Sequence, residues 1–252
     1  MVRTARGSLE VAEFGQGAPV VLLHHGFGTW ASLIRLGERL ADNGRRVIAY
    51  SRAGCGKSPA RSGFGPGYLH YEGAFALPAL LDALGIDKVD LLGHSDGATI
   101  ALIAAAHHPD RVDRVVAIAP HVFVEQRSVD GVRELASRDA KPEFRARLAD
   151  RHNDPDAAYK PWRDLWLSES FRSWSMEPLL KDIRAPLLLL QGTADEFGTE
   201  EQVKRIVAAG SGSASSRMLE GLGHSPHLQQ PDVVFGIIAD HLGLDRPCGV
   251  RR

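Results

Sequence analysis

The sequence has 252 residues, of which 44% are apolar and 24% charged, and this composition is typical of one folded domain with a sizeable core. Its 30 basic and 31 acidic residues leave a formal net charge of −1 and form no block of like charge, so we expect no nucleic-acid partner. The two cysteines lie far apart, and no apolar run is long enough to cross a bilayer. We therefore expect a cytoplasmic protein, monomeric or homodimeric, with no membrane partner.

Strand patterns alternate with helix patterns through the first third of the chain. Residues 9–14 are predicted to form an edge strand, and residues 19–23 and 46–50 are continuous apolar runs typical of strands buried on both faces. Helices are predicted over 30–43 and 69–84, each followed by a glycine that can end it. This alternation predicts an α/β fold, with a mostly parallel sheet and helices on both faces.

Two loops at strand ends could be mistaken for ligand sites of other kinds. His24 and His25 are adjacent, but neighbours in an extended segment point to opposite sides, so a shared metal ion is disfavoured. Residues 56–58, Gly-Lys-Ser, resemble the end of a phosphate-binding loop, yet the glycine that such a loop needs five residues earlier is Ser51. We expect neither a metal nor a cofactor.

The most informative stretch is residues 93–97, with the sequence Gly-His-Ser-Asp-Gly. An apolar run of strand length, 89–92, precedes it, and a run of good helix formers, 98–106, follows it. A serine on a sharp turn between strand and helix needs neighbours almost without side chains, and the flanking glycines meet that need. The hydroxyl of Ser95 is thereby presented at the carboxyl end of the sheet, next to backbone N–H groups at the start of a helix.

A further strand is predicted over 112–119, and residues 121–178 then interrupt the alternation. This segment carries many charges and a concentration of aromatic side chains, and three of the four tryptophans fall between 162 and 174. Trp162 and Trp166 lie one helical turn apart and share a face. Two interpretations remain open: these side chains form the core of a helical insertion, or they line an apolar pocket beneath a lid.

The alternation resumes with a buried strand over 186–190, a helix over 199–208, a strand over 216–219 and a closing helix over 232–241. Asp195 follows the first of these strands and His224 the second. A serine hydroxyl needs a base to take its proton, and the base needs a carboxylate to orient it. Ser95, Asp195 and His224 supply these three groups at three strand ends.

Other residues compete for two of these roles. Glu196 adjoins Asp195, but the spacing from Gly192 favours Asp195 as the acid. His227, three residues after His224, is expected to be structural. His94, inside the serine motif, is expected to turn away from the substrate and to serve in packing or hydrogen bonding.

With these motifs in place, the chain resembles α/β-hydrolase fold enzymes over nearly its whole length. The resemblance is carried by His-Gly-Phe-Gly at 25–28, Ser-Arg-Ala-Gly-Cys-Gly-Lys-Ser at 51–58, the serine motif at 93–97, Gly-Thr-Ala-Asp at 192–195 and Gly-His at 223–224. It implies about eight strands and the order serine, acid, histidine of that fold. It also implies a core over 1–120 and 179–244, a helical cap over 121–178 and a flexible tail over 245–252.

The oxyanion hole is assigned to the backbone N–H groups of Phe27 and Asp96. Many relatives have an apolar residue where this chain has Asp96, and a carboxylate pointing into the hole would oppose a developing negative charge. We therefore expect the side chain of Asp96 to point away or to pair with a cation. Many relatives also have aspartate where this chain has Ser51.

These features predict a serine hydrolase that cleaves a carboxylic ester or lactone of a small apolar or aromatic substrate through an acyl-enzyme on Ser95. The spacing leaves open a carbon–carbon bond hydrolase of ring-cleavage products, a thioesterase or an amidase. A small-molecule receptor with an intact triad is a further alternative. The candidate pocket residues are His25, Phe123, Trp162, Trp166 and Trp174.

Overall fold

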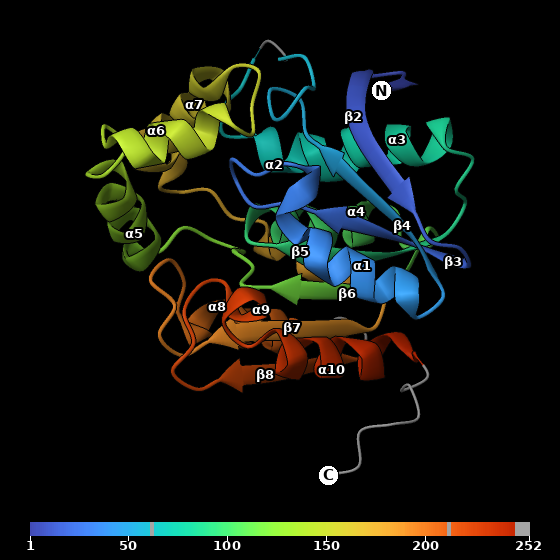
Figure 1. Cartoon of the computed structure of the whole chain (residues 1–252). Coiled ribbons are helices and arrows are strands. Elements are labelled where there is room, and N and C mark those ends of the chain that lie inside the picture. Colours follow the sequence, from blue (N-terminus) through green and yellow to red (C-terminus); the bar gives the residue numbers. More distant parts are fainter. Residues whose placement is uncertain (61–62, 211–212, 245–252) are drawn as a thin grey trace.

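A single eight-stranded sheet organises the chain in the computed structural model, which describes residues 1–60, 63–210 and 213–244. The strands are β1 (Val2–Thr4), β2 (Gly7–Phe14), β3 (Ala18–Leu23), β4 (Arg45–Ser51), β5 (Val89–His94), β6 (Val112–Ile118), β7 (Leu187–Gly192) and β8 (Ala214–Leu219). Their spatial order is β1-β2-β4-β3-β5-β6-β7-β8 (Figure 1). The strands from β3 to β8 pair in parallel, while β1 and β2 pair antiparallel. The expected mostly parallel α/β sheet is confirmed, and the tail expected over 245–252 lies outside the described residues.

The central strands are apolar on both faces because each face is covered by helices. In β3, for example, Val21 and Leu23 belong to one core cluster, and Val20 and Leu22 belong to the other. This division follows from the two-residue side-chain period of a strand. Such strands read as unbroken apolar runs and do not alternate with polar residues.

Helices from different parts of the chain build the two layers. The first core cluster includes residues of α2 (Tyr68–Tyr71), α3 (Leu77–Ala83), α4 (Asp96–His107) and α8 (Glu200–Ala208). The second includes residues of α1 (Ile34–Asp42) and α10 (Pro231–Leu242), which cover the other face. Shorter helical segments are η1 (Trp30–Leu33), the π-helical turn η2 (Glu72–Ala76), η4 (Glu177–Asp182) and α9 (Pro226–Gln229).

Strand β5 lies near the middle of the sheet and leads directly into α4. Every residue of β5 is buried, and so is every residue of α4 from Asp96 to Ala106. A helix that is apolar all round is stable only inside a protein, which explains why this one shows no amphipathic stripe. The turn between β5 and α4 is therefore fixed by packing on all sides.

The segment between β6 and β7 contributes α5 (Gln126–Ala136), α6 (Pro142–Ala149), α7 (Pro155–Leu167) and η3 (Glu169–Phe171). Figure 1 shows α5, α6 and α7 together at the side toward which the arrows of β6, β7 and β8 point. The ring of Trp162 in α7 lies 5.0 Å from that of Phe27, in the loop after β3. These helices therefore sit over the carboxyl ends of the strands. No helix within the described residues is both long and apolar enough to cross a membrane.

Candidate active site

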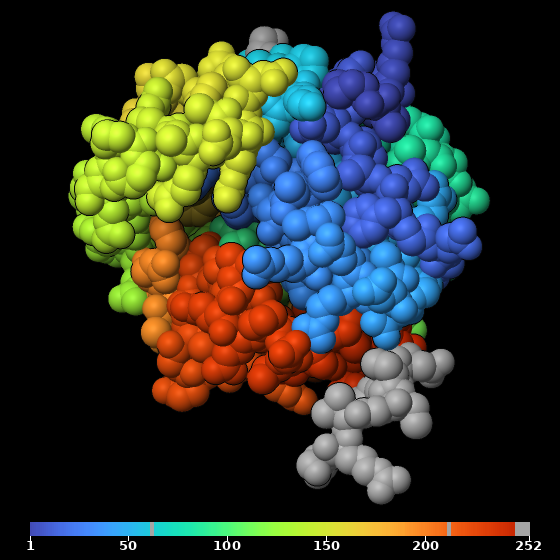
Figure 2. Space-filling view, in the orientation of Figure 1, coloured from blue at the N-terminus to red at the C-terminus, as the bar shows by residue number. Residues whose placement is uncertain are grey.

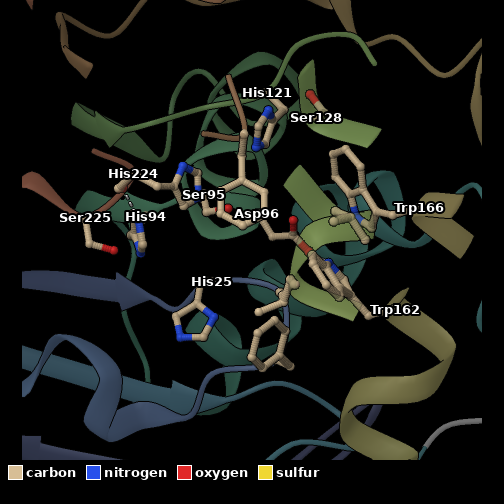
Figure 3. A pocket seen from close by; sticks show the side chains of 15 residues that line it. His25, His94, Ser95, Asp96, His121, Ser128, Trp162, Trp166, His224 and Ser225 are labelled. Atoms are coloured by element: carbon tan, nitrogen blue, oxygen red, sulfur yellow. Dashed lines mark hydrogen bonds between the residues drawn. The ribbon is translucent and has the colours of Figure 1, made fainter. Parts of the chain in front are cut away.

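Ser95 occupies a strained turn between β5 and α4. Its φ of 57° and ψ of −123° lie outside the regions that residues with a side chain normally adopt. The flanking glycines permit the turn, because a Cβ on Gly93 would collide with the backbone of Gly97 and a Cβ on Gly97 with the carbonyl group of Leu23. The strain holds the Ser95 side chain on the wall of a cavity (Figure 3).

Replacing Gly97 with alanine should destabilise the fold by about 3 kcal/mol or more, since the new methyl group meets backbone atoms that cannot rotate aside. The measurement is the free energy of unfolding in urea, followed by circular dichroism. Gly236→Ala is the matched control. Gly236 lies in α10, and no atom lies within 4 Å of the position that a Cβ would occupy. Alanine there should raise the free energy of unfolding by about 1 kcal/mol through its higher helix propensity. Equal stabilities for the two variants would contradict the packing argument.

Asp195 and His224 are brought together by the loops after β7 and β8. Nδ1 of His224 lies 2.9 Å from Oδ2 and 3.0 Å from Oδ1 of Asp195. The backbone N–H of Phe197 and the side-chain amide of Gln191 also donate to this carboxylate, each at 2.7 Å. Burial alone raises the pKa of Asp195, but the hydrogen bond and the charge of His224, with the N–H of Phe197, lower it below its usual value. The carboxylate is thus held ionised and oriented by its partners.

The neighbouring candidates make different contacts. The carboxylate of Glu196 accepts from the backbone N–H of His224 at 3.2 Å, whereas the ring of His224 is bonded to Asp195. Nε2 of His94 lies 2.8 Å from the backbone carbonyl oxygen of His224, yet the ring of His94 also lines the cavity. The expected hydrogen-bonding role of His94 is therefore present, but the expectation that its ring turns away is wrong, because β5 ends at His94 and brings it to the carboxyl end of the sheet beside Ser95. His227 is buried, and its ring lies 4.6 Å from that of His94.

The loop after β3 is held in place by a buried arginine. Arg52, at the end of β4, donates to the backbone carbonyl groups of His24 at 2.5 Å, His25 at 2.8 Å and Gly26 at 3.1 Å. With three successive carbonyl groups turned toward Arg52, the loop runs past the serine in a fixed conformation. Phe27 lines the cavity together with Asp96. Both residues assigned to the oxyanion hole from the sequence therefore line the cavity that Ser95 lines.

The cavity around Ser95 has a volume of about 200 Å³ and is mainly apolar. Its lining residues are His25, Gly26, Phe27, His94, Ser95, Asp96, His121, Ser128, Val132, Leu135, Trp162, Trp166, Phe197, His224 and Ser225. Of the pocket residues predicted from the sequence, His25, Trp162 and Trp166 are among them.

Two predicted pocket residues lie elsewhere. Phe123 packs its ring under the guanidinium group of Arg205, at 3.9 Å. Trp174 stacks on Phe171, with ring centroids 5.4 Å apart. Neither lines the cavity. Aromatic composition predicts that such side chains are buried together, but it does not separate those that face a cavity from those that pack behind it.

The side chain of Asp96 makes an unexpected set of contacts. It is 1% exposed, and its Oδ2 accepts from the hydroxyl of Tyr68 at 2.6 Å and from Nε1 of Trp162 at 3.1 Å. Nε1 of Trp166 in turn donates to the Tyr68 hydroxyl at 3.0 Å. We expected either an outward orientation or a cationic partner. Both expectations are wrong, because the carboxylate lines the cavity and is held by neutral donors (Figure 3).

Burial raises the pKa of Asp96, while the charge of Arg52 and the donors Tyr68 and Trp162 offset part of that rise. Its Oδ1 is buried with no hydrogen-bond partner among the described residues. Asp96 thus ties the tryptophans of α7 to the turn that carries Ser95. The sequence could not reveal this link, since Tyr68 and Trp162 are distant from Asp96 along the chain.

Further histidines surround His224. The ring of His121 stacks on it at 5.8 Å, and that of His94 lies 5.0 Å away. Burial lowers the pKa of His121 to about 3 and that of His227 to about 4, and it lowers the pKa of His94 well below the usual value. These rings are uncharged at neutral pH and place no positive charge beside His224. His121 went unrecognised in the sequence, although its position just after a predicted strand was an available signal.

The chain is similar to known proteins in both sequence and fold. A family model described as the alpha/beta hydrolase fold matches residues 19–153, more than half of the chain. The chain belongs to the α/β hydrolase fold family. Hydrolysis is accordingly the activity class that its family supports.

Individual α/β hydrolase relatives differ in the bond that they cleave. Over 91% of its length the chain is 26% identical to 2-hydroxy-6-oxo-6-phenylhexa-2,4-dienoate hydrolase of Comamonas testosteroni, of which 89% is covered. It is also 23% identical to proline iminopeptidase of Lactobacillus helveticus, with 92% of each chain covered. The structure of carboxylesterase CesB from Bacillus subtilis is similar in fold, with a TM-score of 0.74, 19% identity, and coverage of 99% of this chain and 91% of that one.

Proposed function

We propose that this protein is a serine hydrolase that cleaves a carboxylic ester or lactone with a small apolar or aromatic acyl part, through an acyl-enzyme on Ser95. The observation that carries the proposal is the bond between Nδ1 of His224 and the buried carboxylate of Asp195. It fixes the tautomer that leaves Nε2 free to take a proton, and the ring of His224 lines the same cavity as Ser95.

In the proposed reaction, Oγ of Ser95 attacks the carbonyl carbon while its proton passes to Nε2 of His224. The N–H groups of Phe27 and Asp96 bind the oxyanion that forms. His224 then gives the proton to the leaving oxygen, and the carbon–oxygen bond breaks to leave the acyl-enzyme. A water molecule, deprotonated by His224, attacks that ester, and the second tetrahedral intermediate collapses with return of the proton from His224 to Oγ of Ser95, which releases the acid and restores the enzyme.

The preference for a neutral acyl part rests on the cavity lining. No lysine or arginine of the described residues lines the cavity, and Asp96 contributes a buried carboxyl group. An anionic group placed there would be desolvated without a cationic partner, at a cost of several kcal/mol. The rings of Trp162 and Trp166 instead offer apolar surface, and the volume of about 200 Å³ favours short acyl chains or one ring.

A carbon–carbon bond hydrolase is the second candidate, and one observation favours it. The relative from Comamonas testosteroni, which acts on a dienoate, aligns with nearly the whole chain. The same serine, base and oxyanion donors would serve such a reaction. No cationic side chain is among the described residues that line the catalytic cavity itself, so the carboxylate of a dienoate would need a partner outside that cavity.

A chain-length series of 4-nitrophenyl esters, from acetate to octanoate, tests the proposal. We expect kcat/KM to rise to a maximum at short acyl chains and then to fall by about tenfold for each further pair of methylene groups that the cavity cannot hold. Release of 4-nitrophenolate gives the rates. In a parallel assay, rapid turnover of 2-hydroxy-6-oxo-6-phenylhexa-2,4-dienoate with negligible turnover of every ester would favour the second candidate and reject the first.

A further inference from the structure

A second cavity adjoins the catalytic one. It has a volume of about 300 Å³ and lies between α1, α9 and the turn after α6. Figure 2 shows that the surface is hollowed where the yellow-green α5–α7 segment, the blue N-terminal part and the red C-terminal part meet. His25, His94 and Ser225 line both cavities. In Figure 3 these three side chains lie on the other side of Ser95 from the tryptophans.

The two cavities differ sharply in charge. Arg35, Arg39 and Arg151 line the second cavity, and no acidic side chain from the described part of the chain does. Arg39 is bonded to Asp232 at 2.8 Å, whereas Arg35 and Arg151 are exposed and take part in no ion pair among the described residues. His227 also lines this cavity, and its side chain is 4% exposed. Its Nδ1 has no hydrogen-bond partner among the described residues. Guanidinium groups without an ion-pair partner, together with a buried ring nitrogen without a hydrogen-bond partner, form a surface suited to a carboxylate.

The second cavity lies on the side of the catalytic site from which the alcohol part of an ester would leave. Ser225 follows His224 in the chain, and His94 is bonded to the backbone carbonyl oxygen of His224. The second cavity therefore begins on the side of His224, which gives its proton to the leaving oxygen in the proposed reaction. The tryptophans lie on the opposite side, where the acyl part would be held.

We propose that the second cavity binds a carboxylate on the alcohol part of the substrate, held by Arg35 and Arg151 several bonds from the ester oxygen. This inference rests on the proposed function for the placement of the two halves, while the anion site itself does not depend on it. Two guanidinium groups at an open rim would also attract the anionic substrate from solution, an effect that salt weakens.

The test compares butyrate esters of 4-hydroxybenzoate and 6-hydroxyhexanoate with those of the matching neutral amides. We expect KM for at least one anionic ester to be about tenfold lower than for its amide at low salt, and the difference to shrink in 0.5 M salt. The double variant Arg35→Gln, Arg151→Gln should lose this preference and keep the parent kinetics on the amides. Arg184→Gln is the control. Arg184 lies just before β7, at the amino end of that strand and so at the opposite end of the sheet from Ser95, and it is paired with Asp110. Equal KM values for both ester types, or a preference that survives the double variant, would overturn the proposal.

A binding measurement separates this proposal from the proposed function. Ligand-observed NMR with 6-hydroxyhexanoate and 4-hydroxybenzoate is run on Ser95→Ala, with and without the two arginine substitutions. Arginine-dependent binding of either acid supports the anion site even if no ester is hydrolysed, in which case the proposed function alone fails. Turnover of neutral esters without any arginine-dependent binding rejects the anion site and leaves the proposed function standing.

Discussion

Alanine at position 95 should lower kcat for the best 4-nitrophenyl ester by about 10⁴-fold or more, because the variant lacks the oxygen that forms the acyl-enzyme. The oxyanion donors are backbone N–H groups and persist in the variant, so substrate binding should survive and KM should change little. Steady-state kinetics with enough enzyme to detect the residual rate provide the measurement. The fold should be retained, since the strained turn is accommodated by Gly93 and Gly97 and not by the hydroxyl.

Ser128→Ala is the matched control for this loss. Ser128 is buried, lines the same cavity and has a hydroxyl without a hydrogen-bond partner among the described residues. Its removal should keep kcat within tenfold of the parent. Labelling with an organophosphate should add one phosphoryl group to the parent and to Ser128→Ala but none to Ser95→Ala, as measured by intact-protein mass spectrometry. A tenth or more of the parent activity in Ser95→Ala would reject the acyl-enzyme mechanism.

The parts of the fold that were predictable from sequence are those governed by local patterns. The runs at β3 and β7 are apolar on both faces because helices cover both sides of the sheet, and that burial shows as consecutive hydrophobic residues. Short spacing rules also placed Ser95, since the strand, the turn glycines and the helix are contiguous in sequence. The strand β1, three residues long at the edge, was not predicted, because so short a pairing carries no hydrophobic signal of its own.

Contacts between distant segments were beyond the reach of such patterns. Asp96 meets Tyr68 and Trp162 only because α2 and α7 converge over the start of α4. Simple electrostatics predicted a cation for this carboxylate, whereas aromatic donors satisfy one oxygen and burial raises its pKa. The arginines of the second cavity likewise come from α1 and from the turn after α6, and nothing in their sequence spacing relates them.

The stability of the fold should fall by about 4 kcal/mol or more between pH 7 and pH 5, because several histidines are buried in their neutral form. Burial lowers the pKa of His121 to about 3 and of His227 to about 4, and it lowers the pKa values of His24 and His94 well below the usual value. In the unfolded chain each histidine titrates near pH 6.5. Below that pH the unfolded state binds protons that the folded state excludes, so stability is complete above about pH 6.5 and is lost as the pH falls.

Each such histidine changes the free energy of unfolding by up to about 1.4 kcal/mol per pH unit in this window. The slope of that free energy against pH therefore gives the number of protons taken up on unfolding. Urea unfolding at half-unit steps from pH 7.5 to pH 5 gives the slope. In His227→Gln the slope should fall by about one proton, whereas in His107→Gln, whose side chain is exposed, it should stay at the parent value. A flat profile above pH 5 would mean that these rings accept protons inside the fold.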